Sequence, residues 1–127
     1  MSGSDEENYA QNRRSAALLN ARRQRIRALN DSFRRSLRGG YVTATCGIQH
    51  CGPAATSEIL RSVRTHAQFE AGDDPYCEHD FGAFDFRQAR VFWRIDYYDK
   101  QLEGGSPDPA DPAVTSRVLT IMLASEY

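Results

Sequence analysis

The residues best suited to chemistry lie in one stretch, residues 73–99, which holds seven acidic residues, one histidine and eight aromatic residues. Glu78, His79 and Asp80 are consecutive near its start. A histidine oriented by a carboxylate can act as a general acid or base, and clustered carboxylates can bind a divalent cation. The sequence therefore suggests a catalytic hypothesis in which a neighbouring strand brings Asp96 or Asp99 to His79. The candidates for catalysis are Glu78, His79, Asp80, Asp96 and Asp99.

The same stretch has a simpler interpretation. Acidic clusters commonly cap turns, and the spacing matches no established catalytic motif. We therefore favour a non-enzymatic interaction or regulatory module, with no cofactor, over a small metal-dependent or His/carboxylate hydrolase. The surface expected to bind a partner protein comprises Glu78, His79, Asp80, Asp96, Tyr98 and Asp99.

Two weaker motifs involve the cysteines and a glycine-flanked loop. Five residues could in principle bind zinc: Cys46, His50, Cys51, Cys77 and His79. Their spacing fits neither a zinc ribbon nor a zinc finger. A catalytic thiol needs a histidine that faces it, and adjacent residues such as His50 and Cys51 rarely face each other. The loop 47–52 between a predicted strand and helix lacks the lysine and the glycine order of phosphate-binding motifs. A tight turn is favoured there, and no metal site is predicted.

Arginines follow the first predicted helix. Apolar residues recur at helical spacing over residues 19–37, and arginines fill most of the remaining positions, so an amphipathic helix with a cationic side is expected, ending at Gly39-Gly40. A third hypothesis is therefore nucleic-acid binding through Arg22, Arg23 and Arg25. The overall pI near 6.3 disfavours a dedicated nucleic-acid binder.

Charge is distributed unevenly between the two halves. Residues 1–65 hold 11 basic and 5 acidic residues, which gives +6, whereas residues 66–127 hold 5 basic and 12 acidic residues, which gives −7; the sum is the net −1. The halves either pair internally or present a basic arm and an acidic surface to different partners. Both alternatives stay open from the sequence.

The elements that must position these residues follow from periodicity and turn chemistry. Alternation predicts a strand over residues 41–48, with Cys46 and Ile48 in the core, and Gly52-Pro53 predicts the start of a second helix that continues to about residue 69. Two strands on either side of residues 87–90 predict a hairpin with Trp93 on its buried face. Asp111-Pro112 followed by a broad apolar stripe to Leu123 predicts a closing helix.

This order, helix-strand-helix-strand-strand-helix, predicts an α/β (α+β) fold. We expect a small two-layer sandwich in which the C-terminal helix covers an antiparallel hairpin. A chain of 127 residues suits one core, so residues 19–127 are predicted to form a single domain, preceded by a flexible or frayed helical arm over residues 1–18.

Composition indicates an ordinary globular chain, 40% hydrophobic and 26% charged. No apolar run approaches the roughly 20 residues that a membrane helix needs, and the first residues are acidic rather than basic and apolar as in a signal peptide. Three cysteines without regular spacing argue against a disulfide framework. A cytoplasmic protein that does not bind membranes is expected.

Three segments carry a family resemblance: PYCEHDFGAF, VFWRIDYYD and SPDPADPAVTSRVLTIMLASEY. They resemble a family of small bacterial proteins classed as a domain of unknown function, often met on plasmids and other mobile elements. The resemblance covers Ile26 to Tyr127 and implies one domain in a mobile-element setting, but no activity or catalytic residue. Typical members have glycine where Cys77 stands, so the resemblance implies no special role for this thiol.

Overall fold

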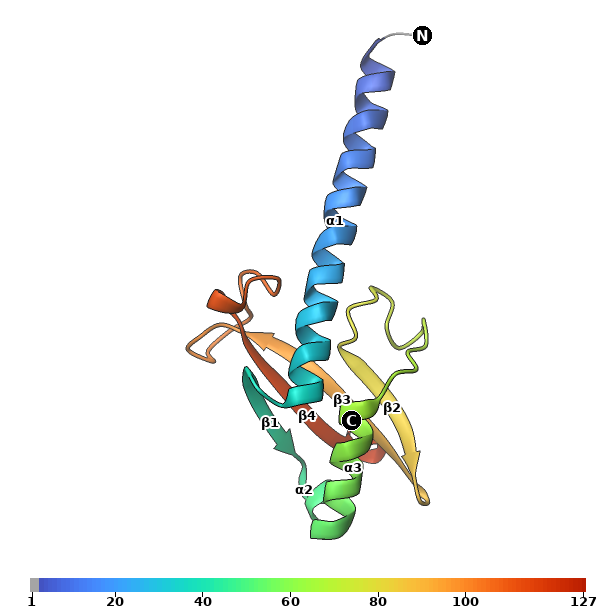
Figure 1. Cartoon of the computed structure of the whole chain (residues 1–127), viewed down its shortest axis with the longest axis vertical. Helices are drawn as coiled ribbons and strands as arrows, with labels where there is room; N and C mark the ends of the chain where they lie inside the picture. Colours follow the sequence, from blue (N-terminus) through green and yellow to red (C-terminus); the bar gives the residue numbers. More distant parts are fainter. Residues whose placement is uncertain (1–2) are drawn as a thin grey trace.

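A computed structural model describes residues 3–127 of the chain. Two longer helices, α1 and α3, lie on one face of a four-stranded sheet, and α1 extends well beyond it (Figure 1). This arrangement confirms the predicted α+β class. The elements are α1 (Gly3–Ser36), β1 (Gly40–Ala44), α2 (Cys46–Gln49), α3 (Pro53–Thr65), β2 (Phe81–Phe86), β3 (Ala89–Tyr98), the 3-10 helix η1 (Pro112–Val114), β4 (Ser116–Leu123) and the 3-10 helix η2 (Ala124–Glu126).

The sheet has the strand order β1-β4-β3-β2. β1 and β4 are parallel, while β4–β3 and β3–β2 are antiparallel. The predicted hairpin is confirmed as β2 and β3, but its loop is only Arg87 and Gln88, because Ala89 and Arg90 already pair with β2. Trp93 lies on its buried face as expected.

The first predicted helix is confirmed and is longer than its apolar pattern indicated. α1 runs from Gly3 through Ser36 without a break at residue 18, so the division into an arm and a domain stays a prediction, and residues 1 and 2 lie outside the described part. The helix ends three residues before Gly39. Leu37 adopts a left-handed backbone, φ 59°, and packs against the core, which offsets part of the cost of that conformation.

The strand predicted over residues 41–48 is shorter. β1 ends at Ala44, and Cys46 to Gln49 form the short helix α2. Ile48 is buried as expected, but the prediction for Cys46 is wrong, because this side chain is exposed. A short run of alternating residues cannot distinguish a strand from one helical turn.

The prediction of a closing helix is wrong. Residues 116–123 form the strand β4, and the helical part is only η1, where the Asp111 carboxylate accepts a hydrogen bond from the Ala113 N–H at 2.9 Å as the capping motif predicted. β4 lies between β1 and β3. Both faces of this strand carry buried residues, such as Leu119 on one face and Met122 on the other. A central strand covered in this way has a near-continuous apolar sequence, which resembles a helical stripe.

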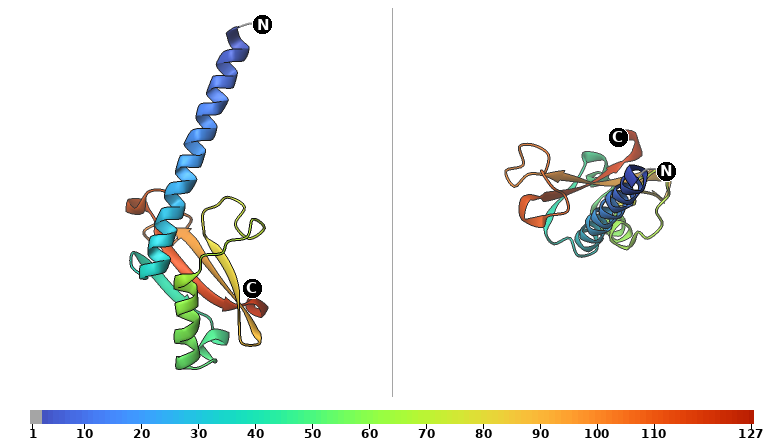
Figure 2. Two further views of the ribbon diagram at one scale, coloured as in Figure 1. Left: turned by 45° about the vertical axis from the view of Figure 1, so that its right-hand side comes forward. Right: turned by 90° about the horizontal axis from the view of Figure 1, so that it is seen from above.

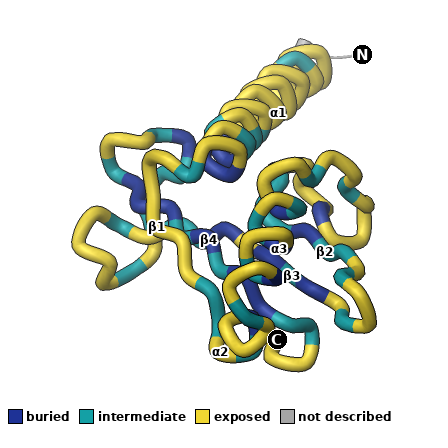
Figure 3. The backbone as a smooth tube through the Cα atoms, turned by 60° about the horizontal axis from the view of Figure 1, so that its bottom comes forward, coloured by how far each residue is buried: buried dark blue, intermediate teal, exposed yellow. Residues whose placement is uncertain are grey.

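The core lies between the sheet and the helices, as the buried segments in Figure 3 show. The second predicted helix is confirmed as α3, with Pro53 in its first turn and Ile59 and Val63 fully buried. Its predicted end near residue 69 is wrong, because α3 ends at Thr65 and the backbone of His66 is no longer helical. These residues pack with Trp93, Leu119 and Ile121 from the central strands. α1 and α3 therefore replace the predicted C-terminal helix as the cover of the hairpin.

The second face of the sheet carries neither α1 nor α3 (Figure 2). We call it the open face. Cross-strand partners point to the same side of a sheet, so the register assigns its residues. The open face comprises Tyr41, Thr43, Phe81, Ala83, Asp85, Arg90, Phe92, Arg94, Asp96, Tyr98, Ser116, Val118, Thr120 and Met122.

Gly82 permits the close packing at the centre of the hairpin. It pairs with Trp93, and a Cβ at position 82 would overlap the Trp93 indole. We predict that Gly82→Ala lowers the free energy of unfolding by about 2 kcal/mol or more, because a buried ring would be displaced. Gly105→Ala, whose Cβ meets no atom within 4 Å, is the matched control. Denaturant unfolding of both variants measures this, and equal stability would contradict the packing described.

Candidate functional site

Arg34 joins α1 to α3 and is completely buried, with 0% of its surface exposed. Its Nη1 donates to the backbone carbonyls of Val63, Arg64 and His66 at 2.9, 3.2 and 2.9 Å. These groups lie at the C-terminal end of α3, where helix carbonyls have no intrahelical donor. The cationic side predicted for α1 is therefore wrong at Arg34, because this guanidinium caps a neighbouring helix instead of facing solvent.

Asp31 connects Arg34 to the loop before β2. Arg34 Nη2 donates to Asp31 Oδ1 at 3.0 Å, and His79 Nδ1 lies 2.9 and 3.1 Å from the two Asp31 carboxylate oxygens. The His79 ring stacks on Phe69 at 3.7 Å, and its Nε2 lies 3.8 Å from Asp74 Oδ2. We call Asp31, Arg34, Asp74 and His79 the α1 clamp. It contains the histidine–carboxylate pairing expected from the sequence, but with Asp31 and Asp74 in place of Asp96 or Asp99.

The backbone of this loop bends around Asp74. The buried Asp74 carboxylate accepts hydrogen bonds from the N–H groups of Glu78 and His79 at 3.0 and 3.1 Å. Cys77 and His79 both have left-handed backbones, with φ of 55° and 56°. Glycine adopts this conformation at little cost, so the two non-glycine residues carry a backbone cost that the Asp74 hydrogen bonds offset in part.

A second polar network lies beside the clamp. Asn30 donates to the Tyr97 hydroxyl at 2.8 Å and to the Glu78 backbone carbonyl at 3.0 Å, and it accepts from Arg117 Nε at 2.8 Å. Tyr97 in turn donates to Glu78 Oε2 at 3.1 Å. Burial raises the pKa of Tyr97 and lowers that of Arg117. This arrangement satisfies the buried polar groups of these four residues and fixes α1 against β3 and β4.

The residues of the predicted partner surface are therefore divided. Glu78 and His79 are bound to Tyr97 and Asp31, on the helix side of the sheet. Asp96 and Tyr98 lie on the open face. The Asp99 carboxylate accepts the Glu103 N–H at 3.0 Å beyond the end of β3. The structure brings together only part of the expected surface.

A cleft of about 540 Å³ lies between residues 72–76 and the open face where β2 begins. Aromatic and charged side chains line it, and the sequence predicted only Asp80 and Asp96 among them as site residues. The Tyr127 ring packs on Phe81 and Phe92, and its centroid lies 6.1 Å from the centroid of Phe81 and 5.5 Å from that of Phe92. The aromatic and charged residues of this open-face cleft are Asp73, Tyr76, Asp80, Phe81, Phe92, Arg94, Asp96 and Tyr127.

Negative charge accumulates around Asp80. Burial, followed by the nearby carboxylates of Glu78, Asp74 and Asp96, raises the pKa of Asp80 to about 6. Arg94, the arginine of the cleft, forms an ion pair with Asp96 at 3.0 Å. Asp80 has no cationic partner among residues 3–127. A bound cation would favour the ionised form of this carboxyl.

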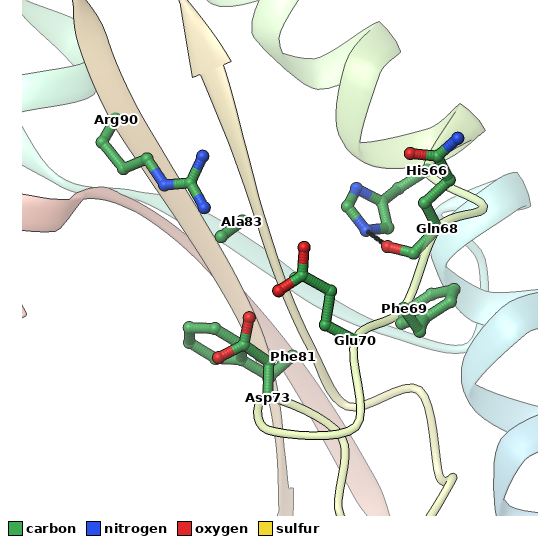
Figure 4. Close-up of a pocket in the computed structure, with 9 residues that line it drawn as sticks. His66, Gln68, Phe69, Glu70, Asp73, Phe81, Ala83 and Arg90 are labelled. Carbon is green, nitrogen blue, oxygen red and sulfur yellow. Dashed lines mark hydrogen bonds between the residues drawn. The ribbon is translucent and has the colours of Figure 1, made fainter.

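A narrower pocket runs along β2 next to the cleft (Figure 4). Glu70 and Asp73 from the loop and Arg90 from β3 extend toward it, and Asp73 also lines the open-face cleft. Its volume of about 20 Å³ is enough for a water molecule but not for a substrate. The larger cleft is therefore the better candidate for binding.

The arginines of the nucleic-acid hypothesis all contact other parts of the chain. Arg22 forms an ion pair with Asp108 at 3.2 Å, and Arg25 Nε donates to the Ala110 carbonyl at 2.8 Å. The guanidinium carbon of Arg23 lies 5.1 Å from the centre of the Tyr76 ring. These contacts orient α1 on the domain and reduce the capacity of the three side chains to bind a partner.

The cysteines and histidines form no metal centre in the described part of the chain. Within residues 3–127 no group of three or more histidine, cysteine or acidic side chains is placed to hold a metal ion. Cys46, Cys51 and Cys77 are free and exposed. The histidine–carboxylate pair of the clamp also lies outside the residues that line the open-face cleft.

Comparison with known proteins places this structure in a family. Residues 44–126 match the family model described as "Protein of unknown function (DUF3768)". The chain belongs to this family. The match covers the elements from α2 to η2, whereas α1 and nearly all of β1 lie outside it. No curated protein and no solved structure matches the chain.

None of the helices in residues 3–127 is long and apolar enough to cross a bilayer. The longest, α1, is also the most arginine-rich.

The α1 clamp predicts a large difference between neighbouring arginines. We expect Arg34→Met to lower the free energy of unfolding by about 3 kcal/mol, because it leaves the α3 carbonyls and Asp31 without their buried donor. Arg35→Met, at an exposed position, is expected to change it by less than about 0.5 kcal/mol. Denaturant unfolding measures both variants; a similar small effect for each would contradict the capping role of Arg34.

The raised pKa of Asp80 predicts a pH-dependent effect on stability. Because the folded pKa is above the ordinary value, ionisation of Asp80 opposes folding, and this cost develops as the pH rises from about 4 to 6. Asp80→Asn should therefore stabilise the protein above about pH 6 and have little effect below about pH 4. With allowance for solvent screening, the gain is about 1 kcal/mol. Thermal unfolding at both pH values tests this, and a gain that does not depend on pH would contradict it.

Proposed function

We propose that the protein is a non-enzymatic interaction module whose open-face cleft binds a basic segment of a partner protein. The observation that carries the proposal is the sheet face that neither α1 nor α3 covers, with an aromatic and acidic cleft at its end. Catalysis is not part of the proposal, because His79 is held in the α1 clamp, away from the cleft.

The side chains of the open face have the composition of a protein interface. Tyr41 is 56% exposed, Tyr98 is 36% exposed and Tyr127 is 72% exposed, and Arg94 is also exposed. Tyrosine and arginine are enriched in interfaces because they combine a large contact area with polar groups. The rings of Phe81, Phe92 and Tyr127 contact one another at this face, and an aromatic cluster at the surface indicates an interaction site.

Charge supports a basic segment as the occupant. Asp73, Asp80 and Asp96 line the cleft with a single arginine, Arg94, so the carboxylates exceed the cations. An arginine or lysine side chain in the cleft would supply the missing positive charge near Asp80, and its apolar stem would pack on the surrounding rings.

Two further parts of the proposal come from the sequence. We place the protein in the cytoplasm, which suits three exposed free thiols. The resemblance to bacterial plasmid-borne proteins leads us to propose a role linked to mobile elements.

Selection of random displayed peptides on the full chain tests the proposal. We expect the wild type to enrich peptides that contain arginine or lysine. The selected peptides should bind Asp80→Asn/Asp96→Asn about tenfold more weakly, because two carboxylates of the cleft are lost and Arg94 no longer has its carboxylate partner. Binding should also weaken as the pH falls through about 6, where Asp80 becomes protonated.

A charge-matched variant controls for the net charge. Glu58→Gln/Glu103→Gln removes two exposed carboxylates outside the cleft and should bind the selected peptides as the wild type does. Selected peptides without enriched basic residues, or equal losses for both double variants, would contradict the proposal.

A further inference from the structure

A second hollow, of about 510 Å³, lies on the helix side of the molecule at the junction of α1 and α3. Arg35, Arg61 and Arg64 line it, and all three are exposed. Five other arginines of residues 3–127 form ion pairs with carboxylates, but these three arginines form none; the five are Arg22, Arg34, Arg87, Arg90 and Arg94. We call Arg35, Arg61 and Arg64 the arginine hollow.

Stabilisation of the helices accounts for only part of this cluster. Arg64 Nε donates to the Arg35 backbone carbonyl at 2.9 Å, so Arg64 caps the end of α1. That contact uses only the backbone of Arg35, so it gives no role to the Arg35 side chain. Arg61 lies a full turn before the end of α3, too early to cap that helix. Three guanidinium groups repel one another, and an anionic ligand would remove this repulsion.

α1 extends the positive surface away from the hollow. Residues 8–30 contain no acidic residue, and besides Arg22, Arg23 and Arg25 they include Arg13, Arg14 and Arg27. The N-terminal half of the helix lies exposed beyond the sheet (Figure 3). Arg14 and Arg35 are 35 − 14 = 21 positions apart. At about 100° and 1.5 Å per residue, they lie within about 60° of each other around the helix and about 30 Å apart along it.

That distance is close to one turn of a nucleic-acid duplex, roughly 34 Å. A straight helix with arginines near both ends of one face can contact phosphate groups that lie about one turn apart on the same side of a duplex. The acidic residues Asp5, Glu6 and Glu7 limit the surface to the part of α1 that follows them.

We propose that the arginine hollow and the adjoining outer side of α1 bind the phosphate backbone of a nucleic-acid duplex. This surface shares no lining residue with the open-face cleft, so the inference is independent of the proposed function. It also differs from Arg22, Arg23 and Arg25, whose side chains contact the domain.

Fluorescence anisotropy with a labelled double-stranded DNA of arbitrary sequence tests the proposal on the full chain. We expect the wild type to bind at low salt and Arg61→Gln/Arg64→Gln to bind at least about tenfold more weakly, with the slope of log affinity against log salt reduced by about 2. Arg87→Gln/Arg90→Gln is the control, because it removes the same charge from the hairpin end and should change affinity less than about threefold.

The single variant Arg61→Gln keeps the Arg64 cap and should reduce the salt slope by about 1, which covers the case in which the double variant folds poorly. Absence of DNA binding by the wild type at low salt would overturn the proposal. Equal losses for the hollow and the hairpin variants would also overturn it, because they would show a response to net charge alone.

Discussion

The structure depends on a buried guanidinium. Arg34 makes hydrogen bonds to three carbonyl groups at the end of α3 and to Asp31, and its guanidinium carbon lies 5.1 Å from the centre of the Trp93 ring. A buried charge is stable only when its hydrogen bonds are satisfied, so α1, α3 and β3 must meet in one geometry. Among residues 3–127 the Arg34 Nε atom alone of this guanidinium has no hydrogen-bond partner, and the guanidinium carbon lies 5.5 Å from the centre of the Phe69 ring.

This constraint reaches the candidate binding site through Asp31. Asp31 binds both Arg34 and His79, and His79 and Asp74 shape the loop that forms one wall of the open-face cleft. The helix side and the open face are thus two parts of one scaffold. Arginines remain exposed on the first and carboxylates on the second, so the halves of the chain pair only partly and each retains surface charge.

The sequence predicts the parts of the fold that depend on local patterns. The hairpin, α3 and the helical character of α1 follow from alternation, a proline at a helix start and apolar spacing. The apolar run of β4 resembles a helical stripe because this central strand has buried residues on both faces, and no local pattern shows that a segment pairs with two other strands. The alternation of β-branched residues such as Val118 and Thr120 was the available signal for a strand.

The site is less predictable because its contacts join distant residues. Asp31 is 48 positions from His79, and Arg34 is 29 from Val63, so their pairing arises only when the helices pack. Arginines of α1 look equivalent in the sequence, yet Arg34 is buried and Arg35 is exposed. Asp80 and Asp96 were identified from their composition, whereas the cleft that they line depends on the fold of residues 72–76.

The central claim is that α1 holds the wall of the cleft through Asp31 and His79. Amide hydrogen exchange of the wild type and Asp31→Asn tests it most directly. We expect faster exchange at the amides of Glu78 and His79, which Asp74 binds, with the β3 and β4 amides still protected. Unchanged exchange at both loop amides would contradict the claim, because the loop would then keep its shape without the α1 clamp.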